Sequence, residues 1–309
     1  MTSPDVCVVV VSYNAVDWLR RCLASIPVRT PAGRVIETVV VDNASGWETR
    51  EYLATRPYGV DLRQQEENLG FGAACNLGAA ATTAQLILLL NPDAALSTST
   101  IDAMADLLEH EPRRGIVGGR TVREDGTLDP RSCWAQPTVW STFAWATGLT
   151  SAFRRSPVFD PESMGGWERD TVREVDIVTG CLLMAARSTW EMLGGFDEDF
   201  FMYGEDADLS LRARRAGFGP SITPRAVALH AVGASSANRL AKQRLLLRGK
   251  ATIMHKHWGA ARRSAGVRLL VAGVGLRALA ETARRKEQVM RPLWHERATW
   301  SAGWPRVET

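Results

Sequence analysis

Three short clusters of hydroxyl, amide and carboxylate side chains stand out because each follows a run of apolar residues. They are Ser12-Tyr13-Asn14, Asp42-Asn43 and Asn91-Pro92-Asp93. Such side chains offer hydrogen-bond donors and acceptors to a polar ligand. Taken alone, a carboxylate after a strand, such as Asp42, is more often a helix cap or a turn residue. The recurrence of the pattern favours a single ligand site built by all three clusters.

The apolar runs that precede these clusters predict the strands that position them. Val6 to Val11, Thr38 to Val41 and Leu86 to Leu90 do not alternate with polar residues, which is typical of parallel strands buried on both faces. Between the first two, Asp17 to Ile26 has apolar residues at helical spacing and is followed by Pro27. This alternation predicts a doubly wound, mostly parallel α/β sheet with helices on both faces. Its ligands are expected beyond the carboxyl ends of the strands.

Further elements are predicted along the chain. Helices are expected at Trp47 to before Pro57, Phe71 to Ala81, Ser97 to His110, Ser188 to Leu193 and Ala207 to Ala216, and strands at Val175 to Ala186 and Ala226 to Leu229. Between Leu128 and Arg173 the periodicity fades, and tryptophans stand among Pro, Gly and Ser. Because long irregular insertions are usually functional or disordered, we expect a loop region there that forms an acceptor-facing lid.

The composition is that of a folded protein with an unusual C-terminal part. The chain has 309 residues, 45% of them apolar and 23% charged, with a net charge of +3. From Arg239 to Arg297, fifteen Lys or Arg accompany only three Asp or Glu. The sequence therefore predicts a main domain over residues 1–235 and a basic helical extension over residues 236–309.

Several classes of protein are disfavoured. The five cysteines are scattered without CxxC spacing, which argues against a disulfide framework or zinc site and suggests a reducing, cytoplasmic location. No secretory signal is evident, and Leu269 to Leu276 is far shorter than the roughly 20 residues of a membrane-spanning helix. The first strand is followed by SYNAVDW rather than GxGxxG, so the fingerprint of nicotinamide-dependent oxidoreductases is absent.

Seven motifs in order resemble the inverting family 2 glycosyltransferases of the GT-A fold, especially a bacterial branch that contains rhamnosyltransferases. The resemblance extends from about Val6 to Ser235. The motifs are VVVSYN (9–14), VVVDNAS (39–45), NLGFGAACN (68–76), LLLNPDA (88–94), TGCLLMAAR (179–187), GGFDEDFFMYGEDADLSLR (194–212) and HAVGAS (230–235). Together they imply an enzyme that takes a sugar from a nucleoside diphosphate donor.

The resemblance assigns a set of residues to donor binding. They are Tyr13, Asn14, Asp42, Asn68, Gly70, Phe71, Asn91 and Asp93. Tyr13, Asn14 and Asp42 would form the nucleoside pocket, where a carboxylate can accept a hydrogen bond from the imide N–H of uracil or thymine. The turn at Asn68 to Gly72 places glycines at a helix start, where the backbone can approach an anionic ligand closely.

The resemblance also assigns the metal and the base. Asp93 and His230 would bind Mg²⁺ or Mn²⁺, which bridges the diphosphate oxygens. Asn91 replaces the first carboxylate of the family's DxD motif, so we expect modest metal affinity without nucleotide. Asp206 would be the base that accepts the proton of the acceptor hydroxyl, whereas Asp208 would be a structural carboxylate.

The leading hypothesis is transfer of L-rhamnose from dTDP-L-rhamnose to a glycan or polyprenyl-linked acceptor. A UDP-hexose or GDP-mannose donor is the alternative, followed by a nucleotide-sugar-binding protein without turnover. No nucleic-acid-reading motif is present, and no residue pattern indicates an oligomeric state.

Two interpretations of the basic extension stay open. In one it holds the enzyme peripherally at an anionic membrane surface, with Trp258 and the Leu269 to Leu276 stretch available for shallow insertion. The expected basic contacts are Arg262, Arg263, Arg268, Arg284, Arg285 and Lys286. In the other it is a helix packed on the domain through Leu245, Leu246, Leu247, Ile253 and Trp258.

Overall fold

The computed structural model describes residues 3–231, 238–283 and 289–305. The chain divides into two compact units. The first consists of Met1–Trp134, Glu168–Asp197 and Asp206–Ser235, and the second of Ala135–Trp167, Glu198–Glu205 and Ser236–Thr309. The domain boundary expected after residue 235 stays a prediction.

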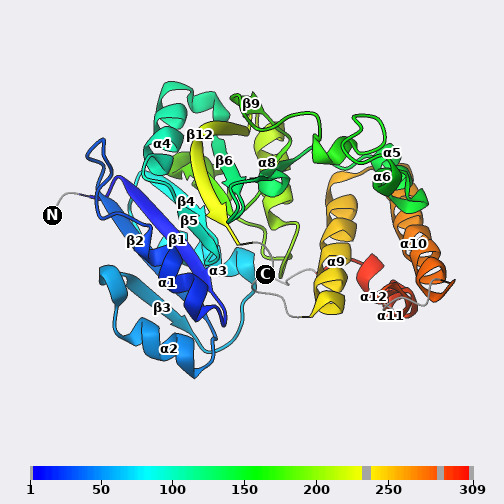
Figure 1. Ribbon diagram of the computed structural model, residues 1–309, viewed down its shortest axis with the longest axis horizontal. Coiled ribbons are helices and arrows are strands. Elements are labelled where there is room, and N and C mark those ends of the chain that lie inside the picture. The colour runs from blue at the N-terminus through cyan, green and yellow to red at the C-terminus, as the bar shows by residue number, and fades with distance from the viewer. Residues whose placement is uncertain (1–2, 232–237, 284–288, 306–309) are drawn as a thin grey trace. The chain divides into compact units, whose positions relative to one another are not determined.

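One mixed sheet forms the centre of the first unit (Figure 1). Among the described residues, eight strands follow the order β3-β2-β1-β4-β11-β6-β12-β5. Their bounds are β1 Val6–Ser12, β2 Ile36–Asn43, β3 Asp61–Gln65, β4 Leu86–Leu90, β5 Ala94–Leu96, β6 Ile116–Val122, β11 Leu182–Ala186 and β12 Ser221–His230. β3, β2, β1 and β4 pair in parallel, as do β6 and β12. β11 is antiparallel to both of its neighbours, and β5 is antiparallel to β12.

Shorter strands extend this arrangement. β7 (Leu128–Asp129) pairs with β6, and β9 (Arg173–Glu174) pairs with β12. β8 (Cys133–Trp134) and β10 (Ile177–Val178) form a separate antiparallel pair. The strand expected at Val175 to Ala186 is therefore interrupted between β10 and β11, at residues 179–181.

Helices cover both faces of the sheet, as predicted. The first unit contains α1 Val16–Ala24, α2 Trp47–Ala54, α3 Phe71–Ala80, α4 Thr100–His110, α7 Arg187–Leu193 and most of α8 Glu205–Arg215. Apolar side chains of α1 and α4 share one core with Val6, Val8 and Val10 of β1. Helix α3 packs on the other face of β1 and β2. There Gly78 faces the side chains of Val9 and Val41, which point away from the core that contains α1 and α4.

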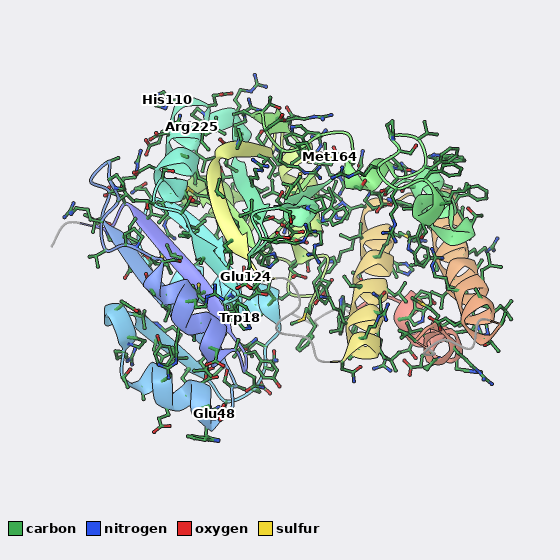
Figure 2. The ribbon with its side chains drawn as sticks, in the orientation of Figure 1. Trp18, Glu48, His110, Glu124, Met164 and Arg225 are labelled. Atoms are coloured by element: carbon green, nitrogen blue, oxygen red, sulfur yellow. The ribbon has the colours of Figure 1, made fainter. Side chains whose placement is uncertain are left out.

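Arg21 connects α1 to the turn after β6 at the surface of this unit. Its guanidinium lies 5.0 Å from the centre of the Trp18 ring and 2.8 Å from a carboxylate oxygen of Glu124. Trp18 and Glu124 are labelled in Figure 2. Because the ion pair is exposed, it contributes at most about 1 kcal/mol to stability.

All five cysteines are free and buried. All of them lie in the first unit. None forms a disulfide, which agrees with the scattered spacing of the cysteines in the sequence. Burial raises the pKa of Cys7 to about 12. No helix among the described residues is both long and apolar enough to cross a membrane.

The second unit is helical. It contains α5 Val139–Thr147, α6 Leu149–Ala152, α9 Arg239–His257, α10 Ala260–Ala283, α11 Met290–His295 and α12 Arg297–Ser301. Its core includes Leu247, Leu270, Val274, Leu293 and Trp300. In Figure 1, α5 and α6 (green) lie beside α10 (orange), on which α5 packs.

The long loop region expected between Leu128 and Arg173 is wrong in part, because α5 and α6 lie within it. Helix α5 begins with a capping box in which Thr138 and Ser141 each bond the other's backbone N–H. Its sequence, VWSTFAWAT, shows little amphipathic pattern because one face packs on α10 while the exposed face is also aromatic. A periodicity test therefore misses the helix.

Helix α10 approaches α5 closely. A side chain on Gly273 would lie 2.6 Å from the Trp145 ring. The Arg277 guanidinium lies 3.9 Å from the centre of that ring and donates hydrogen bonds to the backbone oxygens of Trp145 and Ala146. Burial lowers the pKa of Arg277.

This packing corrects part of the membrane interpretation of the basic extension. Trp258, Leu270 and Val274, which were expected to be available for insertion, are buried within the second unit. Leu247 and Ile253 are buried as well, whereas Leu246, which was expected to pack with them, is 36% exposed. Packing of this helix on the main domain stays a prediction. Arg284, Arg285 and Lys286 lie outside the described residues.

Candidate active site

The predicted site residues gather at one edge of the sheet. β1, β2 and β4 end there at Ser12, Asn43 and Leu90, and β12 ends there at His230. Antiparallel β11 begins at the same edge, because Leu182 pairs with Leu90. The structure thus brings the ends of non-adjacent segments together, as the sequence analysis expected.

Asp42 is a buried carboxylate at the end of β2. Its side chain is 1% exposed, and neither oxygen accepts a hydrogen bond from the described residues. Arg50 forms an ion pair with Asp42, with its Nε 3.7 Å from Oδ2. Because a buried charge without hydrogen bonds is costly, this group suits a ligand that brings a donor. Tyr13, 48% exposed, follows Ser12, which pairs with Asp42 in the sheet.

Asn14 joins the loops that follow β1 and β2. Its backbone has a positive φ of 52°, its N–H donates to Ser45 Oγ at 3.0 Å, and its Oδ1 accepts from the Gly46 N–H at 2.7 Å. The side-chain oxygen is therefore already used in holding the two loops together. A direct role in nucleotide binding stays a prediction.

Asn43 organises the turn that precedes α3, a role that the sequence did not reveal. Its Nδ2 donates to Asn68 Oδ1 at 2.9 Å and to the Gly70 oxygen at 3.0 Å, while its Oδ1 accepts from the Leu69 N–H at 2.9 Å. Asn68 Oδ1 also accepts from the Gly70 N–H. Gly70 has a φ of 84°, which favours glycine. Asn43 thus sets where Phe71 begins α3.

Asp93 and His230 are brought together by the pairing of β5 with β12. Ala94 stands opposite His230 in this ladder, and the Ala231 N–H donates to the Asp93 backbone oxygen at 3.0 Å. As a result, His230 Nε2 lies 3.4 Å from Asp93 Oδ1. The two residues that the resemblance assigned to the metal are neighbours. The HAVGAS motif continues into residues 232–235, which lie outside the described part of the chain.

Asp129 is a third member of this group, and its role was not evident from the sequence. It is fully buried at the end of β7, its Oδ2 lies 3.1 Å from His230 Nδ1, and Arg131 Nε lies 2.7 Å from its Oδ1. The sequence pattern around Asp129 gives little indication of a strand, because β7 has only two residues and lies in the stretch that was expected to be a loop.

The charges of this group stabilise one another. Burial alone would raise the pKa of Asp129, but His230 and Arg131 lower it to about 2. Burial would lower the pKa of His230, but hydrogen bonds and charge from Asp129 and Asp93 raise it to about 9. Near neutral pH the ring is therefore protonated, with Nδ1 toward Asp129 and Nε2 toward Asp93, and a bound cation would have to replace the proton on Nε2.

The donor set fits a divalent cation that also binds the substrate. Within the described residues, no group of three or more His, Cys, Asp or Glu is arranged to hold a metal ion. Asp93 and His230 offer one carboxylate and one imidazole, so most of a coordination shell would come from other oxygen donors such as a diphosphate. The carboxylate behind the imidazole is the arrangement that commonly orients metal-binding histidines.

Asp206 lies in the first turn of α8. Its Oδ2 accepts from the Gly180 N–H at 3.1 Å, and its Oδ1 accepts from the Ala207 N–H at 2.8 Å. Burial raises its pKa, and these backbone donors oppose the shift only in part. A carboxylate with a raised pKa is a stronger general base. Asp208, by contrast, is buried and pairs with Arg212 at 2.6 Å, as expected for a structural carboxylate.

Gly180 connects Asp206 to Phe71. A side chain at position 180 would lie 2.9 Å from Phe71 Cε1 and 3.8 Å from Asp206 Cβ. Only glycine leaves room for the ring while its N–H holds the carboxylate. The break between β10 and β11 is therefore part of the site.

Cys181 lies between the turn that carries Asp93 and the segment that holds Asp206. Burial raises the pKa of its thiol to about 12, and the negative charges of Asp129, Asp206 and Asp93 add to this effect. The Asn91 N–H donates to the Cys181 oxygen at 3.1 Å. This places the turn that carries Asp93 next to the segment that holds Asp206.

Comparisons with known proteins agree with this geometry. Residues 7–163 match Glycosyl transferase family 2. An N-acetylglucosaminyl-diphospho-decaprenol L-rhamnosyltransferase of Mycobacterium tuberculosis (strain ATCC 25618 / H37Rv) is 30% identical over 246 residues, which cover 72% of this chain and 75% of the relative.

Two solved structures share the fold. A mannosyltransferase from Pyrobaculum calidifontis in complex with GDP-Man and Mn²⁺ superposes with a TM-score of 0.58 at 19% identity, over 98% of this chain and 84% of that one. GalNAc-T7 with UDP, GalNAc and Mn²⁺ gives 0.63 at 14% identity, over 98% of this chain and 58% of that one. This chain thus spans somewhat more than half of the GalNAc-T7 chain.

Proposed function

This chain belongs to glycosyl transferase family 2, and on that basis we propose that it transfers L-rhamnose from dTDP-L-rhamnose to a hydroxyl of a polyprenyl-linked or other glycan acceptor. The observation that carries the proposal is the placement of Asp206, a carboxylate with a raised pKa beside the Phe71 turn, at the edge where Asp42 and Asp93 lie. The donor sugar and the lipid-linked acceptor are inferred from the mycobacterial relative.

Asp42 supports a donor whose base carries an N–H. Its buried carboxylate, which accepts no hydrogen bond from the described residues, would accept one from the imide N–H of thymine or uracil. The Asn68 to Gly70 turn would face the diphosphate, because its backbone N–H groups lie at the start of α3. Asn91 and Asp93 would complete the donor site at the end of β4.

In the proposed reaction Asp206 accepts the proton of the acceptor hydroxyl as the oxygen attacks the anomeric carbon. The bond between that carbon and the diphosphate oxygen breaks on the opposite face, so dTDP leaves and the configuration inverts. General-base catalysis of this kind contributes typically about 10²- to 10⁴-fold. Asp93 and His230 would hold a Mg²⁺ or Mn²⁺ ion, whose chemistry is to stabilise the charge on the departing diphosphate.

Donor specificity is tested with the purified full chain. We would incubate it with Mn²⁺, a synthetic N-acetylglucosaminyl-diphosphoryl polyprenol of short chain, and each of dTDP-L-rhamnose, UDP-galactose, UDP-N-acetylglucosamine and GDP-mannose. Nucleotide release and the mass of the product would both be measured. The proposal expects a product heavier by one deoxyhexose with dTDP-L-rhamnose only.

Each contrary outcome has a definite meaning. Transfer from a UDP or GDP donor, with none from dTDP-L-rhamnose, would refute the donor while retaining the family chemistry. Tight binding of a donor without transfer to this or other glycan acceptors would favour a nucleotide-sugar-binding protein without turnover. The position of Asp206 speaks against that second candidate, since a binding protein needs no base there.

A further inference from the structure

An exposed aromatic cluster lies on the second unit. Trp140 and Phe143 stand one turn apart on α5 and are 45% and 38% exposed, and Phe153, just after α6, is 51% exposed. Val158 is 54% exposed, and Phe159 lies between the others, with ring centres 6.2 Å from Trp140 and 5.0 Å from Phe153. These five residues are called the aromatic patch.

Ring stacking and a hydrogen bond hold the side chains of the patch in place. The Trp140 and Phe143 rings stack with centres 5.6 Å apart. The Trp140 Nε1–H donates to the Val158 oxygen at 2.6 Å, so the only polar group of this ring is already satisfied. The rings can therefore enter an apolar medium without losing a hydrogen bond to water. Contiguous exposed apolar side chains of this kind mark interaction surfaces.

Two exposed arginines belong to the segment that carries the patch. Arg154 and Arg155 are exposed and lie between Phe153 and Val158 in the sequence. Two acidic side chains of this segment already have partners within the second unit. Asp160 accepts a hydrogen bond from the Arg155 backbone N–H at 3.1 Å, and Glu162 forms an ion pair with Lys250 at 3.0 Å. Aromatic rings flanked by cations match the boundary between acyl chains and anionic headgroups.

We propose that the aromatic patch is the surface by which this protein binds an anionic lipid bilayer, with the rings at the acyl-chain boundary and Arg154 and Arg155 at the headgroups. The inference deepens the proposed function and rests on it in one respect, since a polyprenyl-linked acceptor presents its reactive group at a bilayer. A second copy of this chain fits the patch less well, because a twofold interface would face the same arginines with one another.

The test is co-sedimentation of the full chain with vesicles of phosphatidylcholine, with or without phosphatidylglycerol, in the absence of donor and acceptor. The variant Trp140→Ser/Phe153→Ser should lose at least about tenfold in affinity for the anionic vesicles, since each ring loses its apolar burial. Arg154→Gln/Arg155→Gln should bind anionic vesicles no better than neutral ones.

The matched control is Leu276→Ser/Leu279→Ser. These leucines are 52% and 70% exposed on α10 of the same unit but lie outside the patch, so binding should be unchanged. If Trp140→Ser unfolds the unit, as thermal melts would show, Phe153→Asp alone, on an exposed position after α6, should abolish binding by placing a negative charge against the lipid.

Three outcomes would overturn the inference. They are equal binding by the wild type and folded patch variants, loss of binding in the leucine control instead, and patch-dependent dimerisation in sedimentation velocity without vesicle binding. Failure of the proposed function is separate, because it would leave vesicle binding intact while rhamnosyl transfer is absent. On a water-soluble acceptor, the patch variants should turn over like the wild type.

Discussion

His230 Nδ1 lies 3.1 Å from Asp129 Oδ2, and this contact presents the other ring nitrogen to Asp93. A buried carboxylate on the two-residue strand β7 therefore sets the orientation of a side chain at the end of β12, 101 positions later in the sequence.

Asp129→Asn should weaken Mn²⁺ affinity in the presence of dTDP by about 10- to 100-fold, because the imidazole loses its anionic orienting partner. Free Mn²⁺ counted by electron paramagnetic resonance gives the affinity without any turnover. The control is Asp125→Asn, an exposed carboxylate that accepts hydrogen bonds from the backbone N–H and the hydroxyl of Thr127. Equal Mn²⁺ affinity in the Asp129 variant and the wild type would rule out this orienting role.

Asp93→Ala should weaken metal and donor binding together, since the proposed ion joins this carboxylate to the diphosphate. Calorimetric titration of dTDP with and without Mn²⁺ should show a metal-dependent gain in the wild type and little gain in the variant. A chelator should stop transfer by the wild type. Full activity of metal-free enzyme would contradict the metal role.

Asp206→Asn should lower kcat by about 10²-fold or more, because the amide cannot accept the acceptor proton. Donor affinity should stay within about threefold, since the change removes little volume. Asp208→Asn is the control: it breaks the buried contact with Arg212, so the melting temperature should fall while kcat is largely kept. Wild-type turnover in the Asp206 variant would remove this residue from the mechanism.

Asp42→Asn should raise the Kd of the donor about tenfold or more, since a hydrogen bond to a charged acceptor contributes about 1.5–3 kcal/mol. Its kcat should change little, because the contact is the same in ground and transition states. The ligand-free variant should be no less stable than the wild type, since it no longer buries a carboxylate that lacks hydrogen bonds. Asp61→Asn on β3, whose partner Arg63 is exposed, should alter neither quantity. An unchanged donor Kd in the Asp42 variant would show that this carboxylate does not contact the base.

We expect kcat, measured as a function of pH at saturating donor and metal, to fall on the acid side. The midpoint of this fall should lie above pH 3.8, the ordinary pKa of the carboxyl group. Burial raises the folded pKa of Asp206, so the base becomes protonated, and kcat falls, as the pH drops through that raised value. The same pKa shift stabilises the folded protein. This stabilisation is fully present below pH 3.8, the pKa in the unfolded chain, and is lost as the pH rises through the pKa of the folded state. The melting temperature of the wild type relative to Asp206→Asn should therefore fall over this window. A midpoint at or below 3.8 would contradict the shift.

The parallel strands and their terminal clusters could be predicted because their signal is local. Leu86 to Leu90 became β4 with the same bounds, and Asp42 and Asp93 lie where strand ends converge. Contacts set by distant pairing could not be predicted in the same way. Asp129 depends on β7 meeting β6, and Gly180 matters only because Phe71 packs against it.

Helix α5 was missed for another physical reason. An aromatic face toward solvent and an apolar face toward α10 leave no contrast for periodicity to detect. The sequence therefore suggested a loop where the structure has a helix that carries part of the aromatic patch.

The placement of the cysteines offers a way to follow one half of the molecule. All five thiols are buried, and all belong to the first unit, while the second has none. A thiol held at a pKa of about 12, as in Cys7 or Cys181, yields almost no thiolate near neutral pH, so an alkylating reagent can react only after the surrounding structure opens. The mass gained during a short alkylation pulse therefore measures how fast the first unit opens and does not report on the second unit, and a bound nucleotide should slow this opening.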